Sequence, residues 1–185
     1  NHIGGDIDVQ SRPGLGTQFF LKLPLSAAIQ GVVLATTENR LYAISQNSIL
    51  EVIPVTQQDL HLLHGQSVLR FRSSIIPVFR LADLILSRGT LTNHHLHFEP
   101  LSLQDKTTVM ILGNGSQRIA VVMDEVVGRE DVFIRGLHKD LRAIHSLSGA
   151  AVLGNGQLVF ILNSTYLIQQ ASQSIAFQLS QQAHQ

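Results

Sequence analysis

Short runs of apolar residues, separated by turn residues at close intervals, dominate the chain and predict a mainly β fold. Near the start, Phe19, Leu21 and Leu23 occupy alternate positions, which is the two-residue period of a half-buried strand. Further runs rich in β-branched and aliphatic residues predict strands at 30–36, 40–45, 68–72, 75–81, 107–112, 118–123, 132–135, 149–154 and 157–162.

Glycine and asparagine mark the turns between these runs. Gly154, Asn155 and Gly156 lie between two apolar runs, and residues 113–115 repeat the Gly-Asn-Gly sequence. Asn-Gly is typical of tight hairpins. Because the long helical crossovers that parallel strands require are missing, the pattern favours an all-β barrel or sandwich over an alternating β-α-β sheet.

The first of two predicted helices spans residues 81–89. It places Leu81, Leu84 and Ile85 on one face and ends at a glycine, as a short amphipathic helix does.

The second helix is predicted at 164–174, with Ser164 or Asn163 as its N-cap. Residues 169–185 contain seven glutamines and only scattered apolar residues, and we interpret them as a helix that frays into a linker or an exposed end. Residues 88–105 lack a clear period, which predicts a long loop between two β units.

The order of the predicted elements repeats along the chain. Residues 40–55 are followed by a hairpin around 68–79, and residues 118–134 are followed by a hairpin around 149–162. We therefore expect two small barrels of about five strands each, packed together.

Composition narrows the function. Thirteen Lys and Arg balance thirteen Asp and Glu, so no net charge attracts nucleic acid or an anionic membrane surface, and the chain has no Trp with which to stack bases. The absence of cysteine excludes disulfides and thiolate chemistry, as expected of a cytosolic protein. No apolar run approaches the roughly 18 to 20 residues that span a bilayer, so we expect no direct membrane insertion. The first residues lack the features of a signal peptide, and a chain that begins with Asn in a predicted strand suggests a piece of something longer.

Histidines are the first candidates for a metal site. His61 and His64 have the i, i+3 spacing of one helix face, which we interpret as solvated. His94, His95 and His97 lie in a polar loop where Glu99 is the only nearby acid, so we expect no metal site there.

Two other pairs resemble catalytic groups. Asp124 and Glu125 are adjacent, but consecutive strand residues point to opposite faces and cannot act on one substrate. Ser146 follows His145 without an evident orienting acid, which argues against a hydrolase triad. We therefore expect no catalytic residues in this chain.

Four segments occur in the order of a known family: RLYAISQNSILEVIPV, VLRFRSSIIPVFRLADLI, RIAVVMDEVVGREDVFIRGL and SLSGAAVLGNGQLVFILN. Together they closely resemble the CheW-like regulatory domain at the C-terminal end of the CheA chemotaxis histidine kinases. Ahead of them, GGDIDVQSRPGLGTQFFLKLPLSAAI is similar to the last glycine box and final strands of the CheA ATP-binding domain. The resemblance covers about residues 3–168.

The resemblance implies a double SH3-like β-barrel of two five-stranded subdomains with short helices, preceded by the last strands of a GHKL ATPase domain. The implied domains are an ATPase remnant at 1–27, the CheW-like domain at 28–168 and a Gln-rich tail or linker at 169–185. Gly128 and Gly149 match family glycines and are expected in turns or bulges. The chain departs from the family at Ser73 and Ser74, where a turn glycine is usual, and at Asn163, where aspartate is common.

The glycine box would place Gly14, Gly16 and Thr17 beside the phosphates of ATP in the parent kinase. Its companion elements, an asparagine box that binds Mg²⁺ and an Asp-x-Gly-x-Gly segment that holds adenine, are absent from the sequence. The family's phosphorylated histidine has no counterpart here either. We therefore expect ATP and Mg to belong to the parent kinase, and this chain alone to be inactive and without a cofactor. The alternative is a nucleotide-responsive fragment that still binds ATP through residues 1–26.

The partners that the resemblance implies are a CheW-type adaptor, the cytoplasmic tip of a chemoreceptor and the kinase domains of the parent chain. The implied location is the cytoplasm, peripheral to membrane receptor arrays. Ile76, Pro77 and Val78 match a Pro-Val hairpin of the family. They are the candidate partner-binding region, although their apolar character favours a role in the core.

Overall fold

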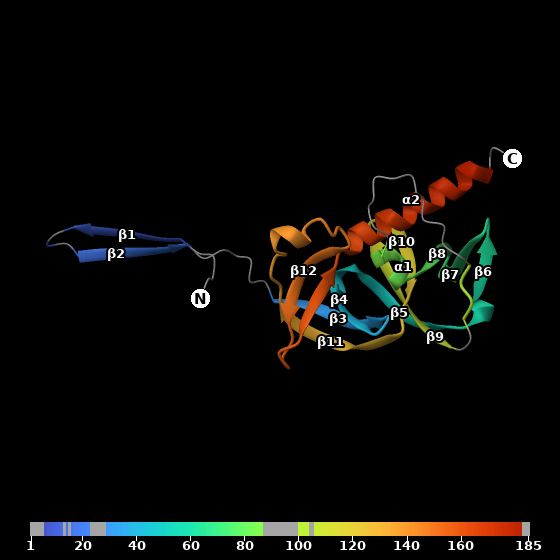
Figure 1. Ribbon diagram of the computed structural model, residues 1–185, viewed down its shortest axis with the longest axis horizontal. Coiled ribbons are helices and arrows are strands. Elements are labelled where there is room, and N and C mark those ends of the chain that lie inside the picture. Colours follow the sequence, from blue (N-terminus) through green and yellow to red (C-terminus); the bar gives the residue numbers. More distant parts are fainter. Residues whose placement is uncertain are drawn as a thin grey trace.

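The computed structural model describes residues 6–12, 14, 16–22, 29–86, 100–103 and 106–182, and within them the chain is mainly β. The strands form a two-stranded hairpin, a six-stranded sheet and a five-stranded sheet (Figure 1). We call the six-stranded sheet "sheet 1" and the five-stranded sheet "sheet 2". The predicted mainly β fold is confirmed.

Sheet 1 has the strand order β5-β9-β10-β8-β7-β6. The neighbours β8 and β10 run parallel, and the other pairs are antiparallel. Its strands are β5 (Ile49–Val55), β6 (Leu60–Leu63), β7 (Gln66–Phe71), β8 (Ser74–Arg80), β9 (Thr107–Asn114) and β10 (Gln117–Val122).

Sheet 2 has the strand order β11-β3-β4-β13-β12. Here β4 and β13 run parallel, and the other pairs are antiparallel. Its strands are β3 (Ile29–Thr37), β4 (Arg40–Ser45), β11 (Glu125–Phe133), β12 (Leu147–Val152) and β13 (Leu158–Leu162).

The predicted repeat is present, but its two copies are interleaved. If β3-β4-β5-β7-β8 is taken as one copy and β9-β10-β11-β12-β13 as the other, exchanging equivalent strands converts the order of sheet 2 into that of sheet 1, with β6 left over. The parallel pairs β4·β13 and β8·β10 occupy equivalent places. Each sheet therefore draws strands from both copies, because the chain crosses to the other sheet after β4 and again after β10.

One further bridge joins the two ends of sheet 2. Past the end of β11, the Arg135 N–H donates to the Ala150 carbonyl at 2.8 Å, and the Ala150 N–H donates to the Arg135 carbonyl at 2.9 Å. This bridge joins the segment after β11 to β12 at the opposite end of the strand order. In sheet 1, by contrast, β6 is the terminal strand and pairs with β7 alone among the described residues.

Both family glycines lie at irregularities of sheet 2, as predicted. The register of β11 against β3 shifts between Val126 and Gly128, and that of β12 against β13 shifts between Leu147 and Gly149. A Cβ on Gly149 would lie 2.8 Å from Ile134 Cγ2 and 3.0 Å from the Arg135 carbonyl oxygen, so the close approach requires glycine. The shift at Gly128 interrupts the alternation of β11, which is why the sequence predicted only its final residues as a strand.

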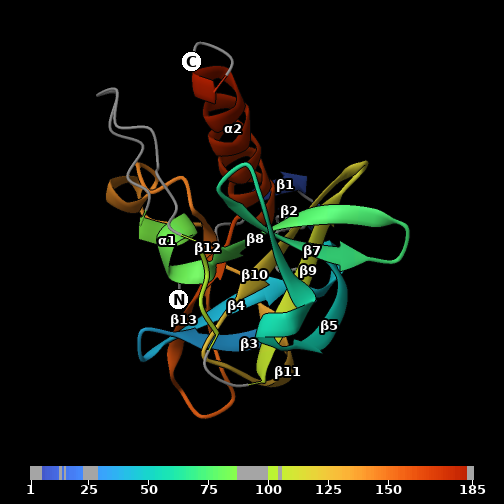
Figure 2. The ribbon, with the colours of Figure 1, turned by 90° about the vertical axis from the view of Figure 1, so that its right-hand side faces the viewer.

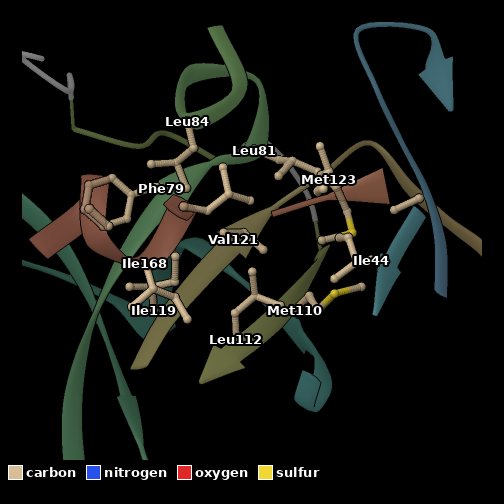
Figure 3. Packing of buried hydrophobic residues seen from close by; sticks show 14 of the residues in the cluster. Ile44, Phe79, Leu81, Leu84, Met110, Leu112, Ile119, Val121, Met123 and Ile168 are labelled. Carbon is tan, nitrogen blue, oxygen red and sulfur yellow. The ribbon is translucent and has the colours of Figure 1, made fainter. Parts of the chain in front are cut away.

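The largest core cluster contains residues from both sheets and both helices (Figure 3). Ile44 comes from sheet 2, Phe79 and Leu112 from sheet 1, and Leu84 and Ile168 from the helices, and all of them are fully buried. Smaller clusters lie within each sheet. Because the central cluster is shared, we expect the two sheets to fold as one unit.

Helix α1 (Leu81–Leu86) follows β8 directly and buries Leu81 and Leu84 completely. It confirms the first predicted helix as far as residue 86, and residues 87–89 lie outside the described residues. Most of the predicted 88–105 loop also lies outside them, but residues 100–103 have no regular structure. There Leu101 is buried, and its N–H donates to Ser67 Oγ at 2.8 Å.

Helix α2 (Ser164–Gln182) is longer than predicted. Asn163 caps it, since its Oδ1 accepts a hydrogen bond from the Tyr166 N–H at 3.2 Å. The helix continues past residue 168, where the Gln-rich tail was expected to begin, and Ala171 and Ser174 are buried. Figure 2 shows α2 rising above the sheets, with α1 to one side of its base. No helix of the described residues is long and apolar enough to cross a membrane.

Candidate functional site

The glycine-rich turn near the start connects a hairpin of β1 (Asp6–Arg12) and β2 (Gly16–Lys22). Gly14 has φ +79° and Gly16 has φ +99°, a backbone conformation that favours glycine. The hydroxyls of Ser11 and Thr17 share a hydrogen bond of 2.9 Å across the two strands. The geometry accounts for the glycines as turn residues, and ATP binding by Gly14, Gly16 and Thr17 stays a prediction.

The hairpin lies apart from the two large sheets (Figure 1). Val9, Phe19 and Phe20 on its strands are exposed. The alternation in this segment therefore predicts its strand correctly, but the burial expected for one of its faces is not found among the described residues.

Ile76, Pro77 and Val78 lie on β8 and divide between its two faces. Ile76 and Val78 are 3% and 1% exposed and belong to the core cluster of sheet 1, which is the structural role that their apolar character favours. Pro77 lies on the outer face together with Ile75, which is 65% exposed. Of the predicted region, only Pro77 lies on the outer face.

An apolar groove of about 210 Å³ lies on this outer face. We call it the β6–β8 groove, and α2 contributes one wall through Ile175. Leu63 on β6, which lines the groove, is exposed, whereas Leu62 lies on the opposite face of the same strand. The residues lining it are Leu63, His64, Gln66, Val68, Ile75, Pro77 and Ile175.

Two polar residues line the groove: His64, which is exposed, and Gln66, which is only 6% exposed. Its Nε2 donates to the carbonyl oxygens of Ser67 at 3.0 Å and Val78 at 2.9 Å, which fixes the orientation of the amide. Its Oε1 is buried without a hydrogen-bond partner among the described residues. A buried acceptor in this state is costly unless something donates to it.

Sheet 2 also exposes apolar side chains, as two cross-strand pairs. Val152 on β12 pairs with Leu158 on β13, and Ile29 on β3 pairs with Phe133 on β11. All four side chains are exposed. The β12–β13 hairpin is the repeat equivalent of β7–β8, so both sheets present apolar residues at equivalent hairpins.

The histidines do not have the expected helical setting. His61 lies on β6, and His64 lies in the turn to β7 with φ +50°, so the interpretation of this pair as a helix face was wrong. The sequence LHLLH lacks a two-residue alternation, which hid the strand. His94, His95 and His97 lie outside the described residues, and within the described ranges no three metal-binding side chains cluster.

The two pairs that resembled catalytic groups serve the fold. Asp124 precedes β11, and its N–H donates to the Thr36 carbonyl at 2.9 Å, so only Glu125 of this pair lies in a strand. Ser146 is buried, and its hydroxyl donates to the Ile85 carbonyl at 3.4 Å. The ring of His145 lies beside that of Tyr166, with the centroids 5.8 Å apart.

The two departures from the family have local explanations. In the β7–β8 turn, Arg72 takes the positive φ, at +54°, just before Ser73 and Ser74. Its Nη2 lies 3.2 Å from Glu51 Oε2, and its guanidinium lies over the Phe71 ring at 5.0 Å. Asn163 provides the α2 cap through its side-chain oxygen, a role that aspartate also fills.

Comparison with known proteins shows the family to which the sequence is similar. The CheW-like domain family matches residues 31–172. Curated relatives include the sensor histidine kinase CheAY of Helicobacter pylori, 30% identical over 161 residues, which are 87% of this chain and 19% of that protein. The chemotaxis protein CheA of Bacillus subtilis is 29% identical over 167 residues, which are 90% of this chain and 23% of that protein. The chain thus spans about a fifth of the length of these relatives.

A solved structure shares the fold. The scaffolding protein TtCheW from Thermoanaerobacter tengcongensis superimposes with a TM-score of 0.51 at 14% identity, over 74% of this chain and 90% of that one. The resemblance found in the sequence is therefore confirmed by the matched family and supported by the fold. The chain belongs to the CheW-like domain family.

Proposed function

We propose that the chain is the regulatory and scaffold module of a CheA-like sensor histidine kinase in chemotaxis-type signalling. It couples kinase activity to receptors by binding a CheW-type adaptor and the cytoplasmic tip of a chemoreceptor. The observation that carries the proposal is the pair of exposed apolar surfaces, at β6–β8 and at β12–β13, on a chain of the CheW-like family.

Physical chemistry supports association as the role of these surfaces. Contiguous exposed apolar side chains, especially beside strand edges, mark interaction sites on soluble domains. Formal net charge is zero, so partners of either sign approach without strong repulsion. The core of a protein interface is apolar with few charges, as these surfaces are.

The remaining kinase functions belong to the parent protein in this proposal. ATP and Mg bind in its ATPase domain, phosphoryl transfer to histidine takes place elsewhere in the parent chain, and this module contacts those kinase domains. The module works in the cytoplasm, peripheral to membrane receptor arrays. It has no catalytic activity alone.

The alternative function is nucleotide sensing through the β1–β2 turn. It draws support from the positive φ of Gly14 and Gly16, since a turn without side chains lets an anion approach the backbone closely. Tight nucleotide binding requires several converging contacts, so the turn needs further elements beside it.

An NMR titration of the isotope-labelled chain distinguishes the two functions. The ligands are a CheW-type adaptor from the same source and, separately, Mg-ATP. We expect the adaptor to shift resonances at one end of one sheet. Mg-ATP should leave the resonances of Gly14, Gly16 and Thr17 unchanged. Saturable ATP shifts at these residues without a response to the adaptor would establish the alternative instead.

A further inference from the structure

The chain contains the sequence Gly-Asn-Gly twice, at residues 113–115 and 154–156. The first copy lies at the turn between β9 and β10 in sheet 1, and the second lies at the turn between β12 and β13 in sheet 2. Asn114 and Asn155 are both exposed. Because the two sequences match, a difference in their chemistry has to come from the surrounding backbone.

An asparagine that precedes a glycine is able to lose its side-chain amide without an enzyme. The glycine nitrogen gives up its proton and attacks the asparagine Cγ, a C–N bond forms, and the side-chain nitrogen leaves as ammonia. Water then opens the cyclic imide to aspartate or isoaspartate, so the net reaction consumes one water and releases one ammonia. Glycine permits the approach because it has no Cβ. The reaction is fastest where the glycine N–H and the asparagine side chain are not held by hydrogen bonds.

The turn at Asn155 holds both reacting groups. The Gly156 N–H donates to the Leu153 carbonyl at 2.9 Å, and the Leu153 N–H donates to the Gln157 carbonyl at 2.9 Å. Asn155 Oδ1 accepts a hydrogen bond from the Gln157 N–H, also at 2.9 Å. The bonds of Gly156 and of Asn155 have to break before the glycine nitrogen can attack, so this turn is protected.

The turn at Asn114 leaves the attacking nitrogen free. Asn114 pairs with Gln117, so Gly115 and Ser116 form the turn. Gly115 is exposed with φ +61°, and its N–H donates to no backbone carbonyl of the described residues. The Asn114 side chain is held only by a hydrogen bond from its Nδ2 to Thr165 Oγ1, which at 3.5 Å is close to the limit for such a bond.

We propose that Asn114 is a site of spontaneous deamidation, with water as the co-reactant, and that its turn protects Asn155 from the same reaction. The proposal does not depend on the proposed function. Conversion makes the formal net charge negative and adds a carboxylate beside Thr165, in the first turn of α2. Negative charge is favourable near a helix N-terminus, so the aspartate product is compatible with the fold. The isoaspartate product lengthens the backbone at the end of β9 by one carbon.

Incubation of the folded 185-residue chain in mildly alkaline oxygen-18 water, followed by peptide mapping with mass spectrometry, measures both conversions in one sample. We expect the Asn114 peptide to gain label about five times faster or more than the Asn155 peptide, since each hydrogen bond that must break lowers the reactive population several-fold. The same incubation in urea removes both turns, and the two peptides should then gain label equally fast. Each incubation continues until the unfolded chain has reacted at both positions.

Two variants assign the reaction to its residue. Asn114→Gln has a longer side chain whose ring closure is slower, so it should abolish conversion in its peptide and leave Asn155 unaffected. Asn155→Gln is the matched control and should leave the rate at Asn114 unchanged. Thermal unfolding shows that each variant folds.

Two results would overturn the proposal. One is conversion of Asn155 in the folded chain as fast as that of Asn114, or faster. The other is no conversion of Asn114 in the folded chain over the time in which the unfolded chain reacts. Both are read from the unchanged chain, so neither depends on the folding of a variant.

Discussion

Sheets 1 and 2 are built from equivalent strands, yet their edges differ. In sheet 2 the bridge between Arg135 and Ala150 joins the two ends of the strand order. In sheet 1 the additional strand β6 continues the sheet, and among the described residues no strand pairs with its outer edge. The difference shows that two sheets built from equivalent strands can share one core and still differ at their edges.

The largest effect is expected from the core that the two sheets share. Leu112→Ala removes a fully buried side chain of the central cluster and should lower the free energy of unfolding by about 2–5 kcal/mol. Because the cluster spans both sheets, NMR probes in β4 and β9 should lose native signal at the same urea concentration. Separate transitions would show that the two sheets unfold independently. They would then have to be compared as two domains and not as two parts of one domain.

The next effect concerns the bridge between Arg135 and Ala150 in sheet 2. Gly149→Ala places a methyl group 2.8 Å from Ile134 and 3.0 Å from the Arg135 carbonyl, and should cost about 1–3 kcal/mol. The Ala150 amide should then exchange with solvent faster, because the bridge opens.

Gly128→Ala is the matched control, since its added Cβ would meet nothing within 4 Å. It should change stability by less than about 0.5 kcal/mol. If both variants lose the same amount of stability, the close contact of Gly149 with Arg135 is not what holds the ends of sheet 2 together.

A smaller effect is expected at the start of α2, which forms one wall of the β6–β8 groove. Asn163→Ala removes the cap on the Tyr166 N–H and should lower stability by about 1 kcal/mol in chemical denaturation. Asn163→Asp keeps a hydrogen-bond acceptor at this position and should retain most of the stability that Asn163→Ala loses. If Asn163→Asp loses as much stability as Asn163→Ala, the helix cap is not how Asn163 stabilises the chain.

The smallest effect is a pH dependence next to β6, in the short 3-10 turn η2 (Gln57–Asp59). Hydrogen bonds from the Thr56 N–H and hydroxyl lower the pKa of Asp59. A folded-state pKa below the unfolded value means that the contribution to stability is present above the unfolded pKa and is lost as pH falls through the folded pKa. Asp59→Asn should flatten the acid side of the stability curve, and an unchanged curve would argue against the carboxylate cap.

Local patterns in the sequence predicted most of the fold. Alternation located the strands, the Gly-x-Gly turns located hairpins, and Gly128 and Gly149 were recognised as sites of irregularity. Interleaving of the two repeats was not predictable in the same way, because strand pairing between distant segments leaves no local mark.

The candidate site was predicted only in part. Alternation on β8 separates buried Ile76 and Val78 from outward Ile75 and Pro77, so the apolar character of Ile75 was the available signal. Strand β6 was missed because its leucines and histidines do not alternate. The wall from Ile175 was missed because glutamines obscured its helical spacing from Leu167, Ile168 and Ala171.

Hydrogen-exchange mass spectrometry of the chain, free and saturated with the adaptor, tests the central claim most directly. The account predicts slower exchange in the complex at one or both of the exposed apolar surfaces, β6–β8 and β12–β13. Unchanged exchange at both surfaces would contradict it.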